Sequence, residues 1–177
     1  IDGEANNDGS GYSISLSDDG STVAIGARNN AGGGTNRGQV RVYKNLNGTW
    51  TQQGADIDGE ADGDQSGWSV SLSADGNTVA IGAPLNDGGG TNRGHVRVYK
   101  NNSGTWTQQG ADINGEANND RSGSSTSLSA DGSTVAIGSI NNAGGGSFRG
   151  HVRVYKNVSG TWTKQGADID GEADDDQ

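Results

Sequence analysis

The chain has 177 residues, of which 33 are glycine, and only 28% are hydrophobic. Glycine usually makes up about 7% of a chain, and this excess argues against a helical bundle. The net charge of −10 disfavours nucleic acid and anionic membranes as partners. The absence of cysteine excludes disulfides and thiolate metal sites. No apolar run approaches the roughly 20 residues that a membrane helix needs, so no membrane insertion is expected.

Four short strands are expected in the first 56 residues. The alternation of Ile14 and Leu16 with serines predicts a strand with one buried face. Turn signals at Asp19-Gly20 and Asn47-Gly48 mark two hairpins. The expected strands cover residues 12–17, 22–27, 39–44 and 49–57.

The same pattern recurs along the chain with a period of 56 residues. The segment Ile1-Asp2-Gly3-Glu4-Ala5 returns from Ile57, from Ile113 (with Asn114 for the aspartate) and from Ile169. The chain therefore divides into three repeats and the start of a fourth, with no linker and no separate domains. These units are residues 1–56, 57–112, 113–168 and 169–177.

A four-stranded antiparallel unit of this size cannot bury its own apolar face and must stack on a neighbour. The predicted fold is therefore all-β, built from propeller-type blades of four antiparallel strands. Small residues such as Ser13, Ala24 and Gly26 would let the next blade approach closely. A β-solenoid or an open blade stack is the alternative. Three blades are fewer than the four to eight of a closed propeller, so we expect association with further repeats or copies.

Three motifs of the second repeat resemble the FG-GAP repeats of integrin-α-like propellers. They are Ser66-Gly67-Trp68-Ser69-Val70, Ile81-Gly82-Ala83-Pro84 and Gly94-His95-Val96-Arg97-Val98-Tyr99. The resemblance extends over all three repeats and implies a propeller blade. The phenylalanine of the family motif is replaced by Ser66. The family's calcium loop between the first two strands is reduced to a tight turn at 17–20, so its calcium sites cannot be carried over to that position.

The acidic loop between repeats is the best candidate for a metal site. Oxygen-bearing side chains at alternate positions of a short loop suit calcium, the one cofactor that the sequence predicts. The alternative is a solvated acidic turn whose carboxylates bond local amides. The candidate ligands are Asp2, Glu4, Asp8, Asp58, Glu60, Asp62, Asp64, Glu116, Asp120, Asp170, Glu172 and Asp176.

One tryptophan recurs in the last strand of each repeat, at Trp50, Trp106 and Trp162. These rings could form a row of platforms for sugars. The favoured interpretation is an outer-strand anchor that packs on the adjacent blade.

Two further side-chain types recur with the repeat. Arg41, Arg97 and Arg153 are expected to form structural ion pairs with Asp56, Asp112 and Asp168. His95 and His151 are predicted to belong to a strand surface, because no positioned nucleophile accompanies them.

Near-identical repeats offer many copies of one weak site rather than one active site. The sequence therefore predicts a non-enzymatic extracellular or cell-surface protein that serves adhesion or forms a structural scaffold or filament. Its expected partners are further repeats or copies of itself, with a protein or glycan as a surface ligand. One alternative is a calcium-dependent or lectin-like binding module. Another is a fragment of a larger propeller protein whose active site lies elsewhere.

Overall fold

The computed structural model describes residues 1–144 and 148–174, in which fifteen strands form three antiparallel sheets. The described residues contain no helix able to span a membrane. The first sheet contains β1 (Ser10–Leu16), β2 (Thr22–Ala27), β3 (Gln39–Leu46), β4 (Thr49–Gln52) and β5 (Ile57–Asp58). The second contains β6 (Ser69–Leu72), β7 (Thr78–Ala83), β8 (His95–Asn102), β9 (Thr105–Gln108) and β10 (Ile113–Asn114). The third contains β11 (Ser122–Leu128), β12 (Thr134–Ser139), β13 (His151–Val158), β14 (Thr161–Lys164) and β15 (Ile169–Asp170).

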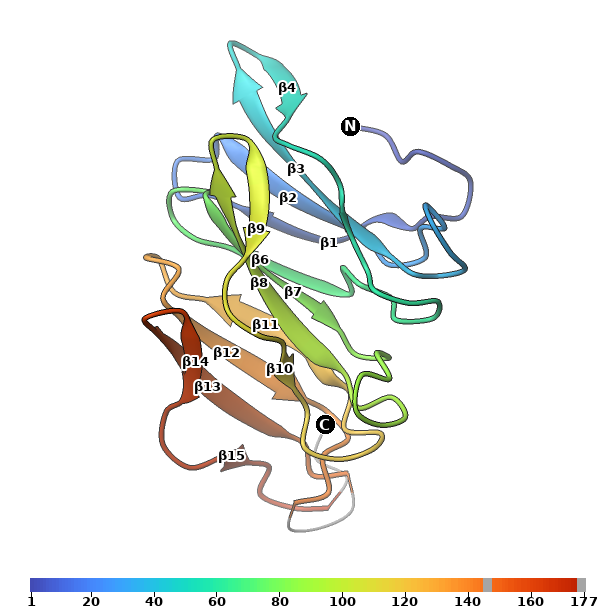
Figure 1. The fold of residues 1–177 in the computed structure, drawn as a ribbon, viewed down its shortest axis with the longest axis vertical. Coiled ribbons are helices and arrows are strands. Elements are labelled where there is room, and N and C mark those ends of the chain that lie inside the picture. Colours follow the sequence, from blue (N-terminus) through green and yellow to red (C-terminus); the bar gives the residue numbers. More distant parts are fainter. Residues whose placement is uncertain (145–147, 175–177) are drawn as a thin grey trace.

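The three sheets stack one after another along the longest axis of the molecule (Figure 1). In each sheet, four strands follow one another in chain order and the short fifth strand pairs with the third. This meander is the arrangement of a propeller blade, and the stack does not close into a ring. The predicted fold class is therefore confirmed. Each blade is offset from the repeat that supplies most of it, because the short fifth strand, such as β5, comes from the first residues of the next repeat.

The predicted strand 49–57 is divided in two. In the first sheet, Gln52 of β4 pairs with Tyr43, and Ile57 of β5 pairs with Val40, so five steps along one strand oppose three along the other. The chain bulges at Gly54, which has a φ of 77°. A Cβ atom on Gly54 would meet the carbonyl of Gly104 in the next blade. The third blade is divided in the same way between β14 and β15, where Gly166 has a φ of 74° and nothing lies within 4 Å of the place of its Cβ atom. The break therefore belongs to each blade and does not need a neighbouring hairpin.

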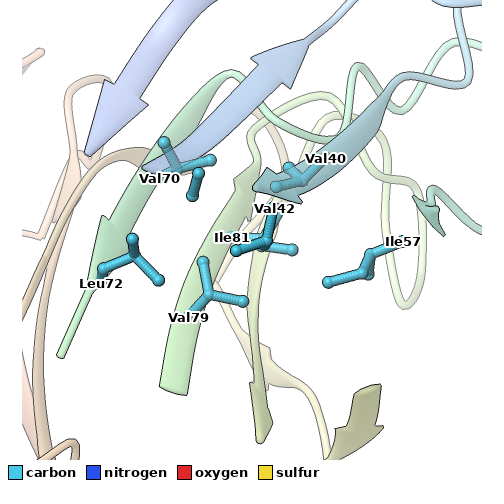
Figure 2. Close-up of a cluster of buried hydrophobic side chains, with 8 residues drawn as sticks. Val40, Val42, Ile57, Val70, Leu72, Val79 and Ile81 are labelled. Atoms are coloured by element: carbon cyan, nitrogen blue, oxygen red, sulfur yellow. The ribbon is translucent and has the colours of Figure 1, made fainter. Parts of the chain in front are cut away.

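The hydrophobic core lies between the sheets. On one side are Ala24, Val40 and Val42 of the first sheet. They face a layer of larger side chains from the second sheet, Val70, Leu72, Val79 and Ile81 (Figure 2). A second cluster repeats this arrangement between the second and third sheets, with Val96 and Val98 facing Leu128, Val135 and Ile137.

Small residues allow the close approach of the sheets, as the sequence predicted. A Cβ atom on Gly26 would meet both the carbonyl of Gly67 and the hydroxyl of Ser13. The hydroxyl of Ser13 donates a hydrogen bond to Gly67 O (2.7 Å), and the next blade repeats it from Ser69 to Gly123 O (2.9 Å). Each blade therefore presents a small, serine-lined face to the large aliphatic face of the blade that follows.

Candidate functional site

The last carboxylate of the acidic loop is buried in each of the three repeats. Asp64 Oδ2 accepts hydrogen bonds from the backbone N–H of Ala61 (3.0 Å) and from Asn86 Nδ2 (2.9 Å). Asp8 and Asp120 make the equivalent bonds in the other repeats. This carboxylate thus closes its own loop and ties it to the glycine-rich loop of the same repeat.

The glutamate of each loop reaches the arginine in the third strand. Glu60 forms an ion pair with Arg97, and Glu116 forms one with Arg153. In the first repeat the corresponding Glu4–Arg41 separation is 3.7 Å. These glutamates are therefore engaged on the sheet rather than directed into their own loop.

The predicted arginine–aspartate pairs form in two of the three repeats. Arg97 Nε and Nη2 lie 2.8 and 3.0 Å from the two carboxylate oxygens of Asp112. Burial would raise the pKa of Asp112, but the bonds from Arg97 outweigh it and hold that pKa below its usual value. Arg153 binds Asp168 in the same way. In the first repeat, Arg41 instead donates to the carbonyl of Asp2 (2.8 Å).

The histidines that the sequence placed on a strand surface are buried. They lie at the start of β8 and β13, and their exposed fractions are 3% for His95 and 5% for His151. Burial, followed by the charge of Arg97, lowers the pKa of His95, so this ring is neutral at pH 7. The strand pattern does not reveal this burial, because the carboxylates that face each ring come from other segments of the same repeat.

The remaining candidate ligands stay apart. Asp2, Asp58, Asp62, Asp170 and Glu172 are exposed. Within the described ranges, no group of three ligands close enough to hold an ion consists of carboxylates from one loop. Asp176 lies outside the described residues. Calcium binding by the acidic loops stays a prediction.

The structure places two of the recurring tryptophans between blades. Trp106 Nε1 donates to Gln53 O of the preceding blade, and Trp162 Nε1 donates to Gln109 O, both at 2.6 Å. Both rings pack on the adjoining hydrophobic cluster. Trp50 has no preceding blade and is 37% exposed. This arrangement favours the anchor interpretation.

A groove lies beside each of these two anchors. The first, of about 260 Å³, is lined by Trp106, Tyr99, Asp56 and Asp58. The second, of about 230 Å³, has Trp162, Tyr155, Asp112 and Asn114 at the same places. An aromatic wall beside carboxylate or amide oxygens offers both stacking and hydrogen-bonding groups to a small polar ligand.

The first blade leaves an apolar face uncovered. Ile14 and Leu16 are 68% and 57% exposed, although their counterparts Val70 and Leu72 in the second blade are 8% and 6% exposed. Among the described residues, no blade covers this face of the first sheet, whereas the first sheet covers the corresponding face of the second. This face lies at the end of the stack that carries the N-terminus (Figure 1).

The third blade leaves the complementary face uncovered at the opposite end. Ile169 is 62% exposed and Val152 is 37% exposed, whereas Ile113 and Val96 in the second blade are 5% and 0% exposed. The two ends thus present the two halves of the interface that is buried twice inside the stack. Together they form the surface with the clearest capacity for binding.

The fold and the repeated interface define a propeller-type repeat protein. The sequence model of the FG-GAP repeat family matches residues 50–99, which confirms the resemblance seen in the motifs of the second repeat. No curated protein sequence matches the chain.

Solved structures with the same architecture are propeller-like repeat proteins of low sequence identity. A putative 6-phosphogluconolactonase from Bacteroides uniformis is 13% identical, with a TM-score of 0.61 over 89% of this chain and 40% of its own. The hydrazine synthase of Kuenenia stuttgartiensis is also 13% identical, with a TM-score of 0.56 over 96% of this chain and 39% of its own. The chain therefore spans well under half the length of these proteins, and the likeness establishes the fold alone.

Proposed function

We propose that this chain is part of a non-enzymatic extracellular repeat protein whose blades stack on further blades to build a scaffold or an adhesive surface. The observation that carries the proposal is the pair of uncovered, complementary faces at the two ends of the stack. Burying such apolar surface is the main driving force of association. The occupant that fits each end is another blade of the same repeat, supplied in the isolated chain by a second copy.

Head-to-tail docking of two copies would recreate the internal core. Ile14 and Leu16 of one copy would cover Val152 and Ile169 of the other, as Val70 and Leu72 cover Val40 and Ile57 inside the chain. Such an interface is heterologous, so it closes a ring if the rotation per blade allows and continues as an open stack if it does not. Two copies would supply six blades, within the usual range of closed propellers.

Polar contacts would accompany this docking. Inside the chain, Leu72 N donates to Ser15 Oγ and Leu128 N donates to Ser71 Oγ, both at 2.9 Å. By the same register, Leu16 N of a second copy would donate to Ser127. The indole of Trp50 would then donate to the carbonyl of Gln165, as the other two tryptophans do to their preceding blades.

The surface composition supports a scaffold or adhesive role outside the cell. The net charge of −10 favours solubility of an extended assembly. The buried aspartates of the loops, the arginine ion pairs and the grooves beside the tryptophans each recur with the repeat. A weak surface ligand would therefore meet many equivalent sites, which favours avidity over catalysis at one site.

The test is the assembly state of the 177-residue chain as a function of concentration. We expect light scattering to show concentration-dependent association, and negative-stain electron microscopy to show rings or continuous stacks. Leu16→Asp and Val152→Asp, one on each open face, should abolish association. Leu46→Asp is the control, because Leu46 is 49% exposed and its counterpart Asn102 stays exposed in the second blade, which has a neighbour on each side. A monomer at every concentration, or association that survives both face variants, would overturn the proposal.

Glycan binding is a second candidate, favoured by the two matching grooves beside Trp106 and Trp162. Titration with a panel of oligosaccharides should shift the NMR signals of these two indole groups. Trp50 serves as the internal control, because no preceding blade forms a groove beside it. Equal shifts at Trp50, or no shift at any concentration, would exclude this candidate.

A further inference from the structure

A buried histidine faces two carboxylates in both the second and the third repeat. His95 at the start of β8 lies between Glu60 of the acidic loop and Asp112, which precedes β10. His151 stands in the same place between Glu116 and Asp168. In each group, one ligand atom from every residue lies within 4.8 Å of the others. We propose that these groups are two corresponding binding sites for a divalent cation of the zinc class.

The histidine nitrogen at the centre of each group has no protein partner. His95 Nδ1 is 3.9 Å from Glu60 Oε2 and 3.8 Å from Asp112 Oδ2, too far for hydrogen bonds. It is nonetheless fully enclosed and unpaired. Both ring nitrogens of His151 are likewise unpaired. Buried polar atoms are nearly always satisfied in folded proteins, so a ligand between the nitrogen and the carboxylates would complete each group.

Neighbouring side chains orient the carboxylates from outside. Arg97 binds Glu60 through Oε1 and contacts both oxygens of Asp112. Gln108 Nε2 donates to Asp112 Oδ1 at 2.7 Å. Asn86 Nδ2 makes a long contact of 3.4 Å with Glu60 Oε2. With these bonds in place, Glu60 Oε2 and Asp112 Oδ2 are the carboxylate oxygens that face the histidine. Carboxylate ligands of metal sites are commonly held by such outer partners.

Charge and ligand type select the cation. Around His95, two carboxylates, one guanidinium and a neutral imidazole leave one net negative charge, which attracts a dication. Around His151 the ammonium group of Lys164 also contacts Asp168, so this group has no excess negative charge and is expected to bind the cation more weakly. An imidazole nitrogen with carboxylate oxygens suits zinc and its neighbours among the transition metals, whereas calcium takes six to eight oxygens. A tetrahedral zinc ion holds its ligand atoms about 3.3 Å apart. The distances from His95 Nδ1 to Glu60 Oε2 and Asp112 Oδ2 would therefore shorten by about half an ångström. Water would occupy the fourth coordination position of the zinc ion.

The first repeat shows what fills this place when no histidine is present. Gln39 stands at the position of His95, and its Nε2 donates to Glu4 Oε2 at 2.9 Å. The amide reaches the carboxylate directly and leaves no unpaired nitrogen in the group. The first repeat is therefore expected not to bind the cation, and a change from histidine to glutamine is compatible with the blade.

The experiment is titration of the full, untagged chain with zinc chloride by isothermal calorimetry. The chain has only two histidines, so the number of sites can be assigned. We expect two zinc ions per wild-type chain, one in His95→Gln, one in His151→Gln and none in the double variant. Cobalt should give absorption bands that follow the same counts, and excess calcium should not displace either metal. Circular dichroism and thermal melting check that the variants are folded.

The stoichiometry decides the proposal. No zinc binding by the wild-type chain would overturn it. Unchanged binding in the folded double variant would also overturn it, because the cation would then bind elsewhere, such as in the acidic loops. Displacement of zinc by excess calcium would also overturn the proposal, because it would indicate an oxygen-ligand site elsewhere, such as in the acidic loops. These outcomes do not depend on whether the chain assembles through its open faces.

Discussion

The tandem repeat allows one substitution to be compared in two environments. Leu72 of β6 is 6% exposed between the first and second sheets, whereas Leu16 occupies the same position of the first repeat and is 57% exposed. Leu72→Ala and Leu16→Ala therefore make the same chemical change in nearly the same local sequence. They differ in whether a neighbouring blade covers the side chain.

The expected costs follow from this burial. Truncation of a buried leucine removes its transfer free energy and leaves a cavity, so we expect Leu72→Ala to lower the free energy of unfolding by about 3 kcal/mol. Leu16 is less than half buried, and solvent fills the space that its truncation leaves. Its cost should therefore be about 1 kcal/mol or less. The difference of about 2 kcal/mol corresponds to roughly 30-fold in the unfolding equilibrium.

Urea denaturation followed by tryptophan fluorescence measures both values, at a chain concentration where light scattering shows a monomer. Equal losses for the two variants in the monomer would refute the argument that stacking between blades provides the core. The same denaturation measured at high chain concentration tests in addition whether the open faces dock. If the open faces dock, the loss for Leu16→Ala should grow with concentration while the loss for Leu72→Ala stays constant.

Three further outcomes are expected. Asp64→Ala should destabilise the chain by about 2 kcal/mol, because it leaves the Ala61 N–H unpaired and Asn86 Nδ2 with only its long contact to Glu60; unchanged hydrogen exchange at the Ala61 amide would contradict this. Trp162→Phe keeps an aromatic ring but loses the bond to Gln109 O, so urea denaturation should show a loss of about 1 kcal/mol, and no loss would argue against the anchor. Hydrogen bonds from Ser17 and then Ser21 lower the pKa of Asp19 to about 2. Its carboxylate therefore stabilises the fold above the unfolded pKa near 4, and this contribution is lost as the pH falls towards 2. Asp19→Asn should melt at a lower temperature than the wild-type chain at pH 7 and at the same temperature at pH 2.

The strands could be predicted because their signals are local. The alternation within 22–27 depends on a two-residue period, and β2 has the predicted bounds. The division of the strand 49–57 could not be predicted in this way. It depends on the left-handed backbone conformation of Gly54, which interrupts the pairing with β3 and which a two-residue period does not indicate.

The candidate sites were predicted less completely. Asp62 and Asp64 have the same charge and lie in the same loop, yet one is exposed and the other is buried against Asn86. Sequence spacing cannot distinguish them, because the difference arises from a loop more than 20 residues away. The group around His95 was missed for the same reason, since Glu60 precedes it by 35 residues and Asp112 follows it by 17.

The sequence by itself determined the repeat, the strand alternation and therefore the blade, because these depend on neighbours within a few residues. Only the tertiary structure decided which apolar faces are covered, which carboxylate of each loop is buried and where the histidines meet acidic partners. Ile14 and Val70 occupy equivalent positions, but only Val70 has a blade packed against it. Burial depends on what lies opposite a residue: for the apolar faces this is another blade, and for Asp64 and His95 it is a distant loop of the same repeat.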